Sequence, residues 1–161
     1  MFTTVLLTEK ALTAHDVERF AHLHDPEPIR IHVVVPAHDD RSELTEVVDD
    51  LARADFGDAF LADHEGVTDA TRSTAADREV QSSIAALTAA GVAQVDGEVA
   101  TDHPVDAVVA LVKSLDADEV VVLTEPHLLT DLTRRDWASR LRHALDKPVL
   151  HVVLGTDQVV S

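Results

Sequence analysis

Basic side chains that could hold an anion gather near the C-terminal end of this sequence. Five of the thirteen lysines and arginines lie in one stretch: Arg134, Arg135, Arg140, Arg142 and Lys147. The adjacent Arg134 and Arg135 could grip a phosphate or carboxylate through bidentate hydrogen bonds. The same two side chains could instead neutralise nearby Asp131 or Asp136. Both arginines are therefore candidate ligand-binding residues, with ion pairing inside the protein as the alternative.

Histidines and carboxylates raise a metal hypothesis. The chain has ten histidines, and the run His38–Asp40 joins an imidazole to two carboxylates. With Glu9 or Glu125 added, these groups could bind a divalent cation. No His-Glu-x-x-His motif is present, and His22 and His24 are two residues apart, so they do not share a helical face. We therefore expect no resident metal ion and no cofactor, and keep a metal-responsive module as an alternative.

The sequence carries few groups suited to nucleophilic catalysis. It has no cysteine, no tyrosine and no Gly-x-Ser-x-Gly motif. The absence of cysteine excludes disulfides, thiol catalysis and iron–sulfur clusters. We therefore expect a protein that is not an enzyme.

Composition narrows the class of partner. At 161 residues the chain is long enough for one domain with a real core, and 45% of its residues are hydrophobic. The net charge is -17, from 30 acidic residues against 13 lysines and arginines. Nucleic acids and anionic membranes need basic clusters, so neither is an expected partner. The N-terminus has no basic signal-peptide region and no stretch approaches a membrane span, which favours the cytoplasm.

The elements that must position these groups alternate along the chain. Five apolar runs are expected strands: Thr4–Leu7, Ile31–Val35, Val95–Ala100, Glu119–Leu123 and Val149–Leu154. Expected helices lie between or beside them: Asp16–Leu23, Leu44–Arg53, Ala75–Ala90, Pro104–Leu115 and Trp137–Leu145. Asp55–Val67, with two glycines, is expected to be a loop, and Ala37–Thr74 as a whole is either a lid or an insert without a role.

This alternation predicts right-handed βαβ units and a mainly parallel five-stranded sheet with helices on both faces. Four of the runs are almost continuously apolar, as is typical of strands covered on both sides, whereas Val95–Ala100 alternates and is expected near an edge. Ligands of such sheets bind beyond the carboxyl ends of the strands. That edge supplies the remaining candidate ligand-binding residues: Thr8, Glu9, Val35, Pro36, Leu123, Thr124 and Glu125.

Two segments carry a resemblance to a known family. TDHPVDAVVALVKSLDADEVVVLTE and RDWASRLRHALDKPVLHVV contain a proline at a helix start, an Ala-Asp before a strand and a Pro-Val-Leu strand. In this order and spacing the chain resembles the universal stress protein family over essentially its whole length. The resemblance implies a single doubly wound domain, a three-layer sandwich of the adenine nucleotide alpha hydrolase-like or flavodoxin-like kind.

The family's ATP-binding glycines are not present at the matching positions. Those members carry Gly-x2-Gly-x9-Gly-(Ser/Thr), because backbone N–H groups must approach the phosphates closely. Aligned on the last strand, this chain has Leu123, Pro126, Asp136 and Trp137 there, and Thr8 or Glu9 where the family has an aspartate. We therefore do not expect ATP as a ligand, and nucleotide binding stays an alternative.

The helix start after this region suggests what replaced the glycines. Thr133 could be the N-cap, with Asp136 reaching back to it as in a capping box. Leu132 and Trp137 would then form a hydrophobic staple across the same turn. In that reading the helix N-terminus, normally favourable for anions, is satisfied by the protein's own carboxylate.

The resemblance also bears on assembly. The family commonly pairs its last strand across a dimer axis, which implies a homodimer here, with His151 either making assembly pH-dependent or standing exposed at the edge. The tail Gly155–Ser161 could extend that edge by a short strand. The sequence thus predicts a homodimeric stress-response or regulatory domain that senses a small ligand. A nucleotide binder using Arg134 and Arg135 is the main alternative.

Overall fold

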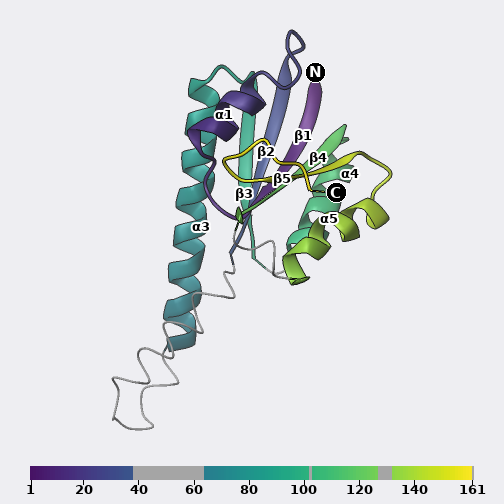
Figure 1. Cartoon of the computed structure of the whole chain (residues 1–161). Helices are drawn as coiled ribbons and strands as arrows, with labels where there is room; N and C mark the ends of the chain where they lie inside the picture. The colour runs from purple at the N-terminus through teal and green to yellow at the C-terminus, as the bar shows by residue number, and fades with distance from the viewer. Residues whose placement is uncertain (38–63, 102, 127–131, 161) are drawn as a thin grey trace.

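The structure is a computed structural model that describes residues 1–37, 64–101, 103–126 and 132–160, with only the backbone described for 64–73 and 132–136. Five strands and four helices are found in these residues (Figure 1). The strands are β1 (Phe2–Thr8), β2 (Ile29–Pro36), β3 (Gln94–Ala100), β4 (Glu119–Thr124) and β5 (Val149–Val153). The helices are α1 (Ala14–Ala21), α3 (His64–Ala89), α4 (Pro104–Leu115) and α5 (Leu132–Ala144).

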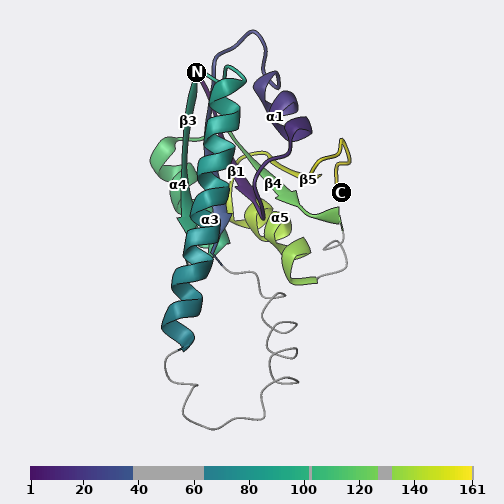
Figure 2. The ribbon, with the colours of Figure 1, turned by 90° about the vertical axis from the view of Figure 1, so that its left-hand side faces the viewer.

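All five strands are parallel, in the order β3-β2-β1-β4-β5. Figures 1 and 2 show the three layers, with α1 and α3 against one face of the sheet and α4 and α5 against the other. The predicted doubly wound α/β architecture is confirmed. No helix in the described part of the chain is long and apolar enough to cross a membrane.

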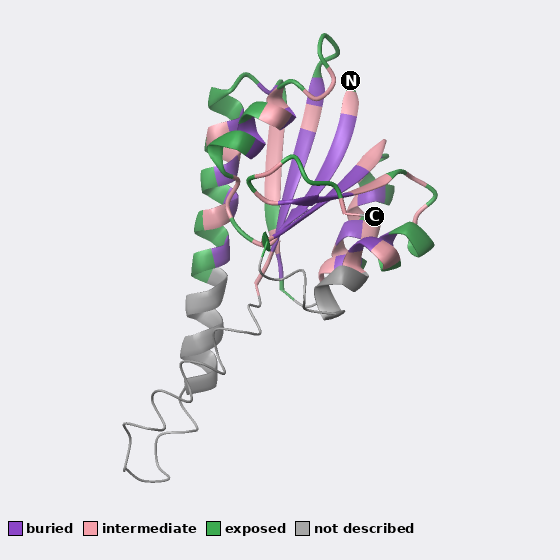
Figure 3. Cartoon of the chain, viewed as in Figure 1, coloured by how far each residue is buried: buried purple, intermediate pink, exposed green. Residues whose placement is uncertain are grey.

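The core lies in two layers because successive side chains of a strand point to opposite faces. Leu6 and Val121 pack with residues of α1 and α3, whereas Val5 and Val122 pack with residues of α4 and α5. Figure 3 shows the buried central strands between the half-buried helices. Burying each such side chain contributes roughly 1.5–3 kcal/mol. The almost continuous apolar runs therefore mark strands covered on both sides, as predicted.

β3 is an edge strand, as its alternating sequence predicts. Its glycine marks a close approach of α3. A Cβ on Gly97 would lie 2.8 Å from Val80 Cγ1 and 2.9 Å from the carbonyl oxygen of Val33. One face of β3 is therefore closed by α3, and any side chain at position 97 would push the helix away.

The C-terminal end of α3 follows the sequence prediction for Gly91. This glycine has a φ of +93°, the left-handed conformation that ends a helix. Its N–H donates to the carbonyl oxygen of Thr88, and the N–H of Val92 donates to that of Leu87. These two bonds form a Schellman motif, which satisfies carbonyl groups that the helix leaves without a partner.

Two predicted helix boundaries are wrong. α3 begins at His64, so the last residues of the predicted loop Asp55–Val67 are helical. α5 begins at Leu132, which places Thr133 inside the first turn rather than at the N-cap. Local cap patterns identify a helix better than its first residue, because competing caps lie within a residue or two of each other. The rest of the predicted loop, the predicted helix Leu44–Arg53 and most of the predicted lid lie outside the described residues.

The tail after β5 folds back along that strand. Gly155 turns the chain with a φ of +72°. Val159 then forms an antiparallel bridge with Val152, and the N–H of Val160 donates to the carbonyl oxygen of His151. The described part of the tail therefore pairs with the edge through a single bridge, and not through the predicted short strand.

Candidate functional site

The strand order reverses between β1 and β4, because the chain passes from β3 at one edge back to β4 beside β1. Ligands of open α/β sheets bind at the carboxyl ends of the strands at this switch point. Thr8 is the last residue of β1, Thr124 is the last residue of β4, and Pro36 is the last residue of β2. The fold thus places the predicted candidate residues around one edge of the sheet.

Two of these candidates contact each other across the switch point. The backbone N–H of Glu125 donates to Oε2 of Glu9 at 2.9 Å. The Glu125 carboxylate pairs with the ammonium of Lys10 at 3.2 Å. The Glu125 side chain is only 15% exposed, whereas the Lys10 side chain is 48% exposed. The carboxyl ends of β1 and β4 are therefore bridged by the protein's own charged side chains.

This bridge changes which ligand charge the switch point favours. The Glu125 N–H, a backbone donor that a ligand anion could use at this edge, already donates to a carboxylate. Among the described side chains, a ligand anion would also approach the carboxylates of Glu9 and Glu125, with the ammonium of Lys10 beside Glu125. Like charges at such short range are unfavourable. Among the described groups, the two carboxylates thus oppose a phosphate close to Glu125.

The two threonines at this edge are buried and bonded inside the protein. Thr8 is fully buried, and its hydroxyl donates to the carbonyl oxygen of Lys10 at 2.7 Å. Thr124 is 2% exposed, and its Oγ1 lies 2.9 Å from Nε2 of His151, itself 2% exposed. The reading of His151 as an exposed edge residue is therefore wrong. Its ring lies beneath the helical layer because it shares a sheet face with the apolar residues of β4.

Other candidates reach the edge only through their backbone or lie beyond what the structure describes. The side chains of Val35 and Leu123 are fully buried in the core. Pro36 is half-buried. Arg134 and Arg135 fall in the first turns of α5, where only the backbone is described. The metal hypothesis for His38–Asp40 lies outside the described residues.

The described residues offer no alternative metal centre, since no group of three histidines or carboxylates among them could hold an ion. His22 and His24 lie near different partners: Nδ1 of His22 is 2.9 Å from Asp25, and Nε2 of His24 is 3.1 Å from Glu119. Their separate contacts agree with the expectation that they do not act as joint ligands.

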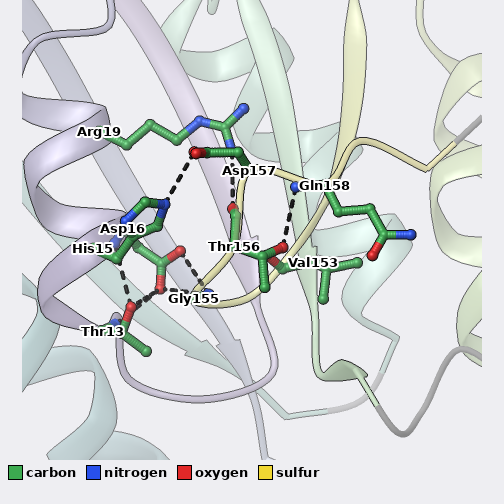
Figure 4. A network of polar contacts seen from close by, with 9 residues as sticks. All are labelled: Thr13, His15, Asp16, Arg19, Val153, Gly155, Thr156, Asp157 and Gln158. Atoms are coloured by element: carbon green, nitrogen blue, oxygen red, sulfur yellow. Dashed lines mark hydrogen bonds and ion pairs between the residues drawn. The ribbon is translucent and has the colours of Figure 1, made fainter.

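A third carboxylate, after Glu9 and Glu125, closes the same edge at the start of α1, and sequence reasoning did not identify it. Asp16 is fully buried. It accepts from the N–H and hydroxyl of Thr13, at 2.9 and 2.6 Å, and from the N–H of Gly155 at 2.9 Å (Figure 4). The spacing Thr13-x-x-Asp16 is the capping-box signal that could have revealed half of this network. The bond to Gly155 depends on the tail and has no local signal.

Charged groups around this contact hold the tail on α1. The guanidinium of Arg19 donates to the carbonyl oxygen of Thr156 at 3.2 Å. Asp157 lies 3.0 Å from Nε2 of His15 and 3.9 Å from the Arg19 guanidinium. Figure 4 shows these side chains converging on the turn after β5. The N-terminus of α1, where a bound anion would be favoured, is thus occupied by Asp16 and the tail.

Solved structures with the same arrangement of strands and helices include universal stress proteins. The chain is similar to one from Archaeoglobus fulgidus in complex with dAMP, with 13% identity, a TM-score of 0.52, and 95% and 98% of the two chains covered. A family protein from Arabidopsis thaliana with AMP bound gives 14% identity, a TM-score of 0.51, and 96% and 94% coverage. A universal stress protein in complex with cAMP gives 14% identity, a TM-score of 0.55, and 96% and 98% coverage of the two chains.

These likenesses cover both chains almost completely, so the chain has the fold of the universal stress proteins, as the sequence resemblance predicted. No protein-family model matches the sequence, and no curated protein matches it.

Proposed function

We propose that this chain is a regulatory domain of the universal stress protein type, which senses a small ligand or a partner protein and does not hold ATP in the family's usual way. The supporting observation is the bridge across the switch point, where the Glu125 N–H donates to the Glu9 carboxylate at 2.9 Å. A backbone donor that could meet a phosphate is there paired with a fixed negative charge. The proposed role is non-catalytic, and the proposed location is the cytoplasm.

The residues that replace the phosphate-binding glycines support the same proposal. Pro126 has no N–H to offer a phosphate, and Asp136 adds a negative charge to this region. Two carboxylates, Glu9 and Glu125, already lie at the edge where the phosphates would approach. An uncharged or cationic small ligand fits these electrostatics better than a triphosphate.

A nucleotide-binding role is the second candidate, favoured by the neighbours that hold dAMP, cAMP and AMP. In this version Arg134 and Arg135 grip a phosphate in place of the glycines. A monophosphate carries less charge than ATP and would be repelled less by Glu9 and Glu125.

The proposed assembly is a homodimer through the C-terminal strand. The tail occupies part of that edge, since Val153 donates to the carbonyl oxygen of Gln158 and Val160 donates to that of His151. The dimer contact therefore has to include the tail or displace it. Light scattering at several protein concentrations would measure the assembly directly.

Calorimetric titration of the purified chain with ATP and with AMP tests the proposal. We expect no heat of binding for ATP at millimolar concentration, and no change in that result for Arg134→Ala/Arg135→Ala. Binding of ATP or AMP that the double substitution abolishes would establish the second candidate instead. Glu9→Gln removes one carboxylate while keeping an acceptor for Glu125. If ATP binds to Glu9→Gln but not to the original chain, the carboxylate is the cause of the exclusion.

A further inference from the structure

A second polar feature lies at the other side of the sheet, on the face of β3 that α3 does not cover. We call it the β3 face and define it by Arg30, His32, Asp96 and Glu98. The register of β2 and β3 sets His32 opposite Asp96 and Val34 opposite Glu98. Since Val34 packs in the core beneath α4, these side chains lie on the α4 side of the sheet.

The acidic residues of the β3 face remain open to solvent. α4 packs on β1 and β2, and the side chains of Asp96 and Glu98 are 43% and 49% exposed. Asp96 is neutralised locally, because its Oδ2 accepts from Nη2 of Arg30 at 2.7 Å and from Nε at 3.1 Å. Glu98 accepts no hydrogen bond from any described residue. One carboxylate of the pair therefore keeps its charge uncompensated.

A buried imidazole points at this carboxylate. The His32 side chain is 10% exposed, and its Nε2 lies 3.7 Å from Oε2 of Glu98, beyond hydrogen-bond length. Neither ring nitrogen has a hydrogen-bond partner among the described residues. Burial lowers the pKa of His32, against the opposing influence of Glu98 and Asp96, so the ring is neutral at neutral pH. The histidine thus leaves the charge of Glu98 available to another group.

The backbone of β3 provides the rest of a docking surface. In the part of the chain that the structure describes, β3 ends the sheet and pairs with β2 along one side only. An open edge of this kind accepts an extended peptide, whose main chain adds a strand while alternate side chains give specificity. A second copy of β3 is a poor occupant, because it would bring Asp96 and Glu98 against the same two carboxylates. A chain of net charge -17 also repels its own copies.

We propose that the outer edge of β3, with Glu98 and the His32 ring on its α4 side, is the docking strand for an extended basic segment of a partner protein. The segment pairs its backbone with β3 and places a lysine or arginine against Glu98. Its next residue points to the opposite face of the sheet, where α3 packs closely on Gly97.

A peptide titration followed by NMR of the full chain tests this proposal. The probe is a seven-residue peptide of alternating arginine and valine with blocked ends, and the matched control alternates glutamate and valine. At pH 7.5 we expect the arginine peptide to shift the backbone resonances of Gln94–Ala100 and the ring resonances of His32. The glutamate peptide should shift neither.

Substitution separates docking at β3 from general attraction to an acidic protein. Glu98→Gln should weaken binding of the arginine peptide about two- to fivefold, the range for an exposed ion pair. Glu18→Gln removes the same charge from the exposed face of α1 and should leave the affinity unchanged. Equal weakening by both variants, or resonance shifts spread over the surface without a focus on β3, would overturn the proposal.

A pH series adds a readout that ties His32 to the same surface. The charged groups facing the ring are Glu98 and Asp96 from β3 and Arg30 from its own strand. Protonation places a positive charge beside Glu98. Because burial lowers the pKa of His32, the affinity should fall as the pH is taken below about 6.5. His32→Asn should flatten this dependence, and His22→Asn, at an exposed position, should preserve it. An affinity that falls equally in His32→Asn would show that the histidine has no part in docking.

Discussion

Replacing Asp16 with alanine should destabilise the protein by about 2–3 kcal/mol. Its carboxylate accepts from the N–H and the hydroxyl of Thr13 and from the N–H of Gly155, and hydrogen bonds to a charged group contribute about 1.5–3 kcal/mol each. The substitution also removes the cost of burying the charge, and the donors on exposed Thr13 and Gly155 can bind water. The removed burial cost and the hydration of the freed donors offset part of the three bonds, which leaves a net loss of about 2–3 kcal/mol.

Thermal and urea unfolding followed by circular dichroism measure this loss. For a chain of this size 1 kcal/mol corresponds to about 2–4 °C, so Tm should fall by about 4–12 °C. Glu18→Ala on the exposed face of the same helix is the matched control and should change the unfolding free energy by less than about 0.5 kcal/mol. Asp16→Asn keeps one acceptor oxygen, so its loss of unfolding free energy should lie between those of Asp16→Ala and Glu18→Ala.

Amide exchange shows whether the loss arises where the structure places it. In Asp16→Ala the N–H of Gly155 should exchange faster, while the N–H groups of the central strands keep their protection relative to global unfolding. An unfolding free energy within about 0.5 kcal/mol of the original chain would refute the role of this network. So would a Gly155 amide whose exchange does not change.

Three further substitutions test other parts of the fold. Gly97→Ala should lower the free energy of unfolding in urea by about 1–3 kcal/mol, because the new Cβ would lie 2.8 Å from Val80 Cγ1. An unchanged free energy would contradict the close packing of α3 on β3. Thr124→Val should lower the free energy of unfolding by about 1–3 kcal/mol, since His151 loses the hydroxyl that lies 2.9 Å from its Nε2. The NMR signals of the His151 ring should also shift, and unchanged signals would argue against the bond. Because burial lowers the pKa of His32, the unfolded chain binds this proton first. Stability should therefore decrease as the pH falls below about 6.5, and His32→Leu should remove that part of the dependence in unfolding curves at pH 7.5 and 5.5.

The strands could be predicted from the sequence because burial on two faces leaves a direct signal. Val120, Val121 and Val122 are all fully buried, and an unbroken apolar run of this kind is typical of a central parallel strand. The alternation at Asp96 and Glu98 correctly placed β3 near an edge. Each of these signals lies within a single strand and needs no knowledge of the rest of the chain.

The contacts of the candidate site could not be predicted in the same way. Glu9 was correctly placed at the switch point, but its bond to the Glu125 N–H joins residues 116 apart in the sequence. The bond between Asp16 and Gly155 joins residues 139 apart. Such pairings depend on how two loops meet at the sheet edge, and no local pattern encodes that meeting.

The position of β1 in the middle of the sheet has a consequence for how the protein is made. Its Thr4 pairs with Glu119 of β4, and the hydrogen bond to Asp16 from the Gly155 N–H forms only after Gly155 has been synthesised. A ribosome therefore completes most of the chain before the first strand gains its second neighbour, and the apolar run Val5–Leu7 stays without that cover during synthesis. Non-local pairing of this kind folds slowly and exposes sheet edges. The nascent N-terminal half thus keeps one side of β1 unpaired until β4 has been synthesised.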